Sequence, residues 1–128
     1  EITESVMMNI EESSKVIRGL RGLGIKIAID DFGAGYSSLT VIKNIEIDTL
    51  KIDKSLIDDM LVNPRNLSIL KAIIEVGKGL DTLVVVEGIE KEDQVELLRN
   101  FDVIGQGYYY SRPCPPLALE NLWENVAH

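Results

Sequence analysis

The stretch IKIAIDD, residues 25–31, is apolar and rich in β-branched residues, and it ends in two aspartates. This composition favours a β-strand, and apolar residues on both faces are typical of a strand that is covered on both sides in a parallel sheet. Comparable stretches follow as IDTLKID at 47–53, TLVVVEGIE at 82–90 and VIGQGYYY at 103–110. The sequence therefore predicts about four strands.

Segments with helical periodicity separate these strands. Capping and helix-breaking residues predict a helix from Ser13 to Gly24, a short helix from Ser37 or Ser38 to Lys43, a helix from Asn66 toward Gly77 and Gly79, a helix over 91–100 and a last helix from Pro115 and Pro116. Because strands and helices alternate, we expect parallel βαβ units in one α/β domain over residues 1–128.

Composition excludes several classes of function. The 128 residues, 45% of them hydrophobic, suffice for one core, and the net charge of -8 disfavours binding to DNA, RNA or anionic lipid. The only histidine, His128, is the last residue, which argues against a Ser/His/Asp triad or a His-rich zinc site. The single Cys114 fits a reducing compartment, so we expect a cytoplasmic protein, and no apolar run is long enough to cross a membrane.

Polar residues stand at or just after the carboxyl end of each predicted strand. They are Asp30 and Asp31, Lys51 and Asp53, Glu87 and Glu90, and Gln106. In parallel α/β folds these ends form one rim, where ligands bind. Carboxylates that converge there must protonate, pair with a cation or bind a metal, and oxygen ligands favour Mg²⁺ or Mn²⁺. Such a rim suits metal-dependent hydrolysis of a phosphodiester.

Five segments in this order give the chain a resemblance to the C-terminal half of an EAL domain. They are EITES at 1–5, DDFGAGYSSL at 30–39, LKIDKSLI at 50–57, VEGIE at 86–90 and QGYYYSRP at 106–113. The EAL family comprises bacterial phosphodiesterases that hydrolyse cyclic di-GMP to linear pGpG on a (β/α)8 barrel with Mg²⁺ or Mn²⁺. The resemblance implies the second half of a TIM-type barrel, which is an incomplete barrel.

The resemblance also implies roles for the rim residues. Glu1, Asp30 and Asp31 match metal ligands of the family, and Lys51 matches the lysine that contacts the hydrolytic water. Glu87 matches the glutamate that acts as general base or as a partner of water and metal.

Two further positions match residues outside the metal shell. Glu90 matches the glutamate that holds the loop after the aspartate pair, and Gln106 matches a glutamine near the substrate. The loop FGAGYSS at 32–38 matches one that orders metal and dimer contacts.

The chain begins at Glu1, so the family's Glu-Ala-Leu motif and an asparagine ligand are not part of it. We therefore expect weak metal binding, no activity of this chain alone, and a parent protein that carries GGDEF or sensor domains. An alternative is a non-catalytic receptor for cyclic di-GMP, or a regulatory or dimerisation module. Four parallel strands leave open edges and an uncovered face, which predicts a homo-oligomer.

Several residues also have a simpler interpretation. Without the resemblance, Asp30 and Asp31 would be taken as solvated acids at a strand end. Glu90 also suits the start of a helix. The tyrosines at 108–110 alternate in the predicted strand, so at least one should pack in the core, and Trp123 fits the apolar face of the last helix.

Overall fold

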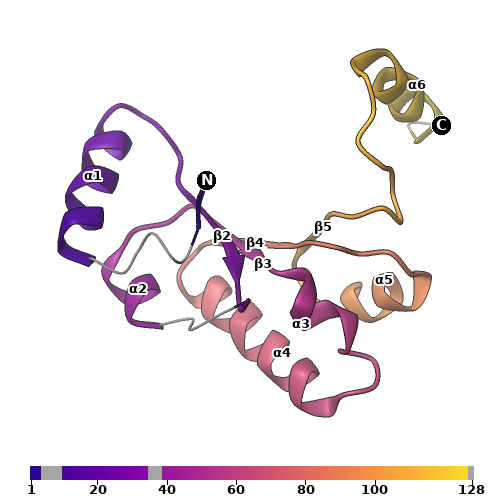
Figure 1. The fold of residues 1–128 in the computed structure, drawn as a ribbon, viewed down its shortest axis with the longest axis horizontal. Helices are drawn as coiled ribbons and strands as arrows, with labels where there is room; N and C mark the ends of the chain where they lie inside the picture. The colour runs from indigo at the N-terminus through magenta and orange to yellow at the C-terminus, as the bar shows by residue number, and fades with distance from the viewer. Residues whose placement is uncertain (4–9, 35–38, 127–128) are drawn as a thin grey trace.

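The computed structural model describes residues 1–3, 10–34 and 39–126. Its elements alternate between strand and helix along most of the chain (Figure 1). They are β1 (Ile2–Thr3), α1 (Ile10–Gly22), β2 (Ala28–Phe32), α2 (Leu39–Asn44), β3 (Thr49–Ile52), α3 (Lys54–Asp58), α4 (Pro64–Gly79), β4 (Leu83–Val86), α5 (Glu92–Leu98), β5 (Ile104–Gly105) and α6 (Pro116–Val126). Among the described residues, no helix has the length and apolar character that a membrane span requires.

The strands form one sheet in the order β1-β2-β3-β4-β5, and all four pairings are parallel. The predicted α/β class with parallel strands is therefore confirmed. The sheet has one strand more than predicted, because Ile2 and Thr3 pair with Ile29 and Asp30. A strand of two residues is too short to produce a periodic pattern in the sequence.

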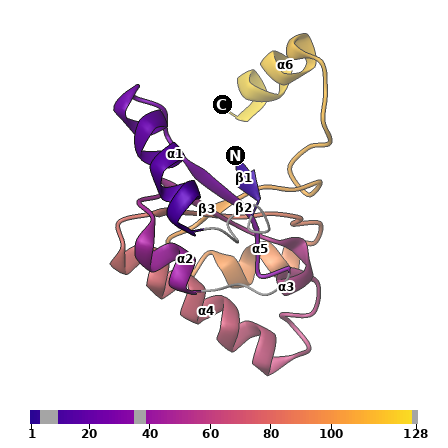
Figure 2. The same cartoon turned by 60° about the vertical axis from the view of Figure 1, so that its left-hand side comes forward.

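The register divides the strand residues between two faces of the sheet. Ile29, Leu50 and Val84 lie side by side in neighbouring strands and are buried, as are Ile52 and Val86. Helices α2 to α5 lie on this side (Figures 1 and 2), and the hydrophobic core formed here also includes Ile17 of α1.

The opposite face, called here the open face, consists of the strand residues that alternate with the buried ones. It carries Ala28, Asp30, Thr49, Lys51, Leu83, Val85 and Ile104. Leu83 and Ile104 are about half exposed, at 48% and 49%. The open face therefore combines charged groups with accessible apolar side chains.

Helix starts differ from the predicted ones. Helix α4 begins at Pro64, three residues earlier than the residue after Asn66, because the Asn63 side chain accepts a hydrogen bond of 3.0 Å from the backbone N–H of Arg65. Proline is well suited to the first position of a helix. Helix α1 begins at Ile10, so Ser13 lies inside it and not at its cap. The proposed caps Ser37 and Ser38 lie outside the described residues.

Helix α3 was not predicted, because its five residues are too few for a helical period to show. Asp53 caps it, since its Oδ1 accepts a hydrogen bond of 2.8 Å from the N–H of Ser55. The Asp53 N–H in turn donates to the carbonyl oxygen of Phe32 at 3.0 Å. The start of α3 is thereby attached to the end of β2.

The C-terminal region departs most from expectation. The predicted strand 103–110 is wrong beyond Gly105, because residues 108–110 form a turn in which all three tyrosines are at least 40% exposed. Helix α6 lies apart from the sheet at the end of an extended segment (Figures 1 and 2). Trp123 on this helix is 75% exposed.

Candidate functional site

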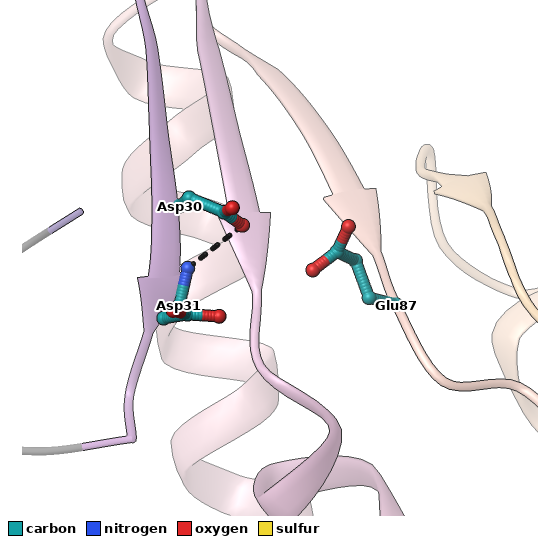
Figure 3. A group of neighbouring side chains, drawn as sticks. All are labelled: Asp30, Asp31 and Glu87. Carbon is teal, nitrogen blue, oxygen red and sulfur yellow. Dashed lines mark hydrogen bonds between the residues drawn. The ribbon is translucent and has the colours of Figure 1, made fainter. Parts of the chain in front are cut away.

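The predicted rim residues lie at the carboxyl ends of three neighbouring strands. Asp30 and Asp31 are near the end of β2, Lys51 is in β3, and Glu87 directly follows β4. Figure 3 shows the three carboxylates directed toward the same space in front of the sheet. This is the position at which parallel α/β folds bind their ligands.

A β-bulge brings the two aspartates together. Between the pairs Ile29–Leu50 and Phe32–Ile52, two residues of β2 lie opposite the single Lys51 of β3. Asp31 adopts a φ of 57°, in the left-handed region that aspartate tolerates better than most residues. In a regular strand consecutive side chains point to opposite faces, whereas a bulge redirects one of them.

The bulge is held by a local hydrogen bond. The N–H of Asp31 donates to Oδ1 of Asp30 at 3.0 Å (Figure 3). As a result, one carboxylate oxygen each from Asp30, Asp31 and Glu87 lies within 4.8 Å of the other two. Three oxygen donors at this separation fit a hard divalent cation such as Mg²⁺ or Mn²⁺. Sequence spacing alone does not reveal that both aspartates share one side.

Lys51 neutralises part of this acidic cluster. Its Nζ lies 2.8 Å from Glu87 Oε1, 2.9 Å from Glu1 Oε1 and 3.4 Å from Asp30 Oδ1. Only 12% of its side chain is exposed. Burial by itself lowers the pKa of Lys51, but the hydrogen bonds to Glu87 and Glu1 and the charge of Asp30 outweigh it and raise this pKa above its usual value. The amine therefore remains a cation at neutral pH.

Glu1 joins the site through Lys51. Its side chain is 58% exposed, and it accepts the hydrogen bond from Lys51 described above. It is not one of the three residues whose carboxylate oxygens cluster within 4.8 Å. The structure thus brings Glu1 to the rim but gives it the amine as its contact.

Glu90 is not among the three carboxylates of the acidic cluster, and the structure gives both Glu90 and Gln106 other partners. Glu90 Oε1 contacts Lys54 Nζ at 2.5 Å, and this hydrogen bond lowers the pKa of Glu90 and raises the pKa of Lys54. Residues 35–38 of the loop that Glu90 was expected to hold lie outside the described residues. Gln106 is exposed, and its backbone N–H donates to Val86 while its carbonyl accepts from Ile89.

Sequence reasoning missed Lys54. It lies next to the predicted strand 47–53, but an exposed lysine at a helix start carries no signal of its own. Only the fold shows that it reaches Glu90, which is 36 residues away in the sequence.

A parallel sheet flanked by helices, with acids gathered at the carboxyl ends of its strands, defines part of a TIM-barrel-type α/β domain. The chain belongs to the EAL domain family, whose family model matches residues 1–113. Helix α6 lies beyond this match, so the domain boundary at residue 128 stays a prediction.

Comparisons with known proteins agree with this assignment. The chain is 43% identical over 124 residues to the cyclic di-GMP phosphodiesterase NbdA of Pseudomonas aeruginosa, covering 95% of this chain and 16% of NbdA. It superposes on the PaMucR phosphodiesterase in complex with c-di-GMP with a TM-score of 0.85 and 36% identity, over 92% of this chain and 49% of that one. Against BlrP1 of Klebsiella pneumoniae, in a calcium and cy-diGMP complex, the TM-score is 0.82 at 34% identity, over 88% and 29% of the two chains.

Proposed function

We propose that this chain supplies half of the active site of a metal-dependent phosphodiesterase that hydrolyses cyclic di-GMP to linear pGpG. The observation that carries the proposal is the convergence of Asp30, Asp31 and Glu87 within 4.8 Å, beside the amine of Lys51, whose side chain is 12% exposed. The names of the similar proteins support the substrate, since NbdA is a cyclic di-GMP phosphodiesterase and PaMucR is a phosphodiesterase in complex with c-di-GMP.

The donor set fits Mg²⁺ or Mn²⁺, which Asp30, Asp31 and Glu87 would hold. A BlrP1 structure that contains manganese and cy-diGMP supports this choice of metal. A divalent ion bound there would acidify a coordinated water and offset the charge of the phosphodiester. Because Glu1 is more than half exposed and contacts Lys51, we expect the ion to bind weakly to this chain alone.

Glu87 and Lys51 are suited to handle the proton. Glu87 would accept a proton from the attacking water, while Lys51 would donate a hydrogen bond to that water and keep Glu87 oriented, as its contact of 2.8 Å already does. The water oxygen would form a bond to phosphorus as one phosphorus–oxygen bond to ribose breaks, and the proton held by Glu87 would pass to the leaving ribose oxygen, which becomes a hydroxyl. One such step opens the cyclic dinucleotide to linear pGpG. Gln106 would contact substrate near this centre.

A turnover assay tests the proposal. We expect a complete EAL domain that contains this chain to convert cyclic di-GMP to pGpG with Mg²⁺ or Mn²⁺, as measured by chromatography of the nucleotides. The chain of 128 residues alone should be at least about 100-fold slower, because precise positioning contributes factors of this order.

Each other outcome is informative. Rapid hydrolysis by the 128 residues alone would contradict the expectation that this chain is inactive by itself. Binding of cyclic di-GMP without turnover by the complete domain would contradict the enzyme and favour a receptor or regulatory module.

We further propose that the isolated chain self-associates through its open face. Leu83 and Ile104 are about half exposed there, and burial of such apolar area drives association. Sedimentation at micromolar concentration should give a mass above the 14.2 kDa of the monomer, and the double variant Leu83→Asn, Ile104→Asn should shift it toward the monomer. A compact monomer of the unmodified chain would contradict this prediction.

We also propose a cytoplasmic protein with further domains, such as GGDEF or sensor domains. The free, exposed Cys114 is consistent with a reducing compartment. The chain spans 16% of the length of NbdA, which leaves room for such domains in proteins of this kind.

A further inference from the structure

The segment from Glu87 to Lys91 joins β4 to α5 and carries Glu87 into the acidic cluster. Its conformation decides where this carboxylate lies. Gly88 adopts a φ of 72°, in the left-handed region, so the chain turns sharply directly after Glu87. A short loop with such a turn must be held from outside if Glu87 is to keep its position.

Helix α3 contacts this loop at the Lys54 side chain. The stem of Lys54 lies across Gly88, because a methyl group on Gly88 would be 2.5 Å from Lys54 Cγ and 2.6 Å from its Cβ. Beyond the glycine, Lys54 Nζ reaches Glu90 Oε1 at 2.5 Å. The side chain therefore spans the turn and is anchored on its far side.

A buried glutamine of α5, Gln94, connects the backbone of the loop to α3. Gln94 is 2% exposed, and its Oε1 accepts hydrogen bonds from the N–H groups of Glu90 at 2.9 Å and Lys91 at 3.1 Å. Its Nε2 donates to the carbonyl oxygen of Ile57 in α3 at 3.4 Å. Glu90 is thus held by its side chain at Lys54 and by its backbone at Gln94.

The start of α3 is itself tied to the strand that carries the two aspartates. The Asp53 N–H donates to the carbonyl of Phe32, the residue that closes the β-bulge. A continuous set of contacts therefore runs from the bulge through Asp53 and Lys54 to the loop of Glu87. The start of α3 therefore contacts both the strand that carries Asp30 and Asp31 and the loop that carries Glu87.

We propose that Lys54 is a positioning residue, which fixes the loop over Gly88 so that Glu87 faces Asp30 and Asp31. This inference rests on the proposed function and assigns Lys54 no contact with the substrate or the metal. The pair of Lys54 with Glu90 is exposed, at 44% and 43% of the two side chains, so its effect on overall stability should be small. Loss of this pair should therefore change the position of Glu87 while leaving the free energy of unfolding nearly unchanged.

The test uses Lys54→Met in a complete EAL domain that contains this chain. Methionine keeps an aliphatic stem over Gly88 but cannot pair with Glu90. We expect kcat for cyclic di-GMP to fall by about 10- to 100-fold, with KM changed by less than about threefold, as for residues that orient metal ligands. The affinity for Mn²⁺, measured by electron paramagnetic resonance, should weaken by a similar factor.

Three further variants isolate the ion pair. Lys54→Arg should restore kcat and Mn²⁺ affinity to within about threefold of the unmodified domain, since it keeps a cation that can reach Glu90. Glu90→Gln should reproduce Lys54→Met, and the double variant should be no worse than either single one, because both remove the same contact. Lys71→Met, on the exposed side of α4, is the matched control and should have no effect.

The outcomes separate this inference from the proposed function. Unchanged kcat and Mn²⁺ affinity in both Lys54→Met and Glu90→Gln would overturn the role of Lys54. A domain that does not hydrolyse cyclic di-GMP but loses Mn²⁺ affinity in these variants would overturn the proposed function and support the positioning role. If Lys54→Met does not fold, Glu90→Gln gives the same information without altering the stem over Gly88.

Discussion

Glu87→Gln should lower kcat for cyclic di-GMP hydrolysis by about 10²- to 10⁴-fold in a complete EAL domain that contains this chain. Glutamine has the size of glutamate, but its amide cannot accept a proton from water. It also offers a weaker oxygen to a divalent ion. Lys51 keeps its contacts with Glu1 and Asp30, so the fold should be retained. Initial rates at saturating substrate measure the effect.

A matched control is Glu46→Gln at the opposite end of the sheet. The Glu46 side chain is 87% exposed and contacts Arg21 at 3.5 Å, a surface pair that contributes little to stability. The Glu46→Gln domain should hydrolyse cyclic di-GMP at the rate of the unmodified domain. If Glu87→Gln also keeps this rate, Glu87 has no part in the chemistry.

The second large effect is expected for Asp30→Asn. Asparagine retains an oxygen that can accept the hydrogen bond from the N–H of Asp31, so the bulge should persist. The negative charge is lost from a cluster of three carboxylates, and the affinity for Mn²⁺ should fall by at least about 10- to 100-fold. Turnover at a fixed, subsaturating Mn²⁺ concentration should fall in parallel. Titration with Mn²⁺ by calorimetry measures the first effect directly.

Asp102→Asn provides the comparison for this variant, because Asp102 is an exposed aspartate between α5 and β5. The Asp102→Asn domain should bind Mn²⁺ with the same affinity as the unmodified domain. Equal Mn²⁺ affinity in Asp30→Asn and Asp102→Asn would show that the acidic cluster is not the metal site.

Much of the architecture could be predicted from the sequence because the core strands are strongly patterned. The buried runs around Ile29, Leu50 and Val84 gave three strands at nearly the correct places, and their parallel order followed from the helices between them. Parallel order also placed Asp30, Lys51 and Glu87 at one rim, and they do meet there.

Features that depend on only a few residues could not be predicted in this way. The strand Ile2–Thr3 and helix α3 are shorter than the periods that would reveal them. The three tyrosines at 108–110 were expected in a strand because aromatic residues favour strands, yet β5 ends at Gly105. The pairing of Lys54 with Glu90 requires the tertiary fold, since no local pattern relates the two positions.

The β-bulge also decides how the rest of β2 is packed. Ile29 and Phe32 are both in the core, although an odd spacing would place them on opposite sides of a regular strand. Only Asp30 and Asp31 lie between them, so removing one residue would give a regular spacing that keeps both apolar side chains in the core but deletes one aspartate of the acidic cluster. Proteins that share this arrangement should therefore accept exchanges of apolar side chains at either position far more readily than an insertion or deletion between them.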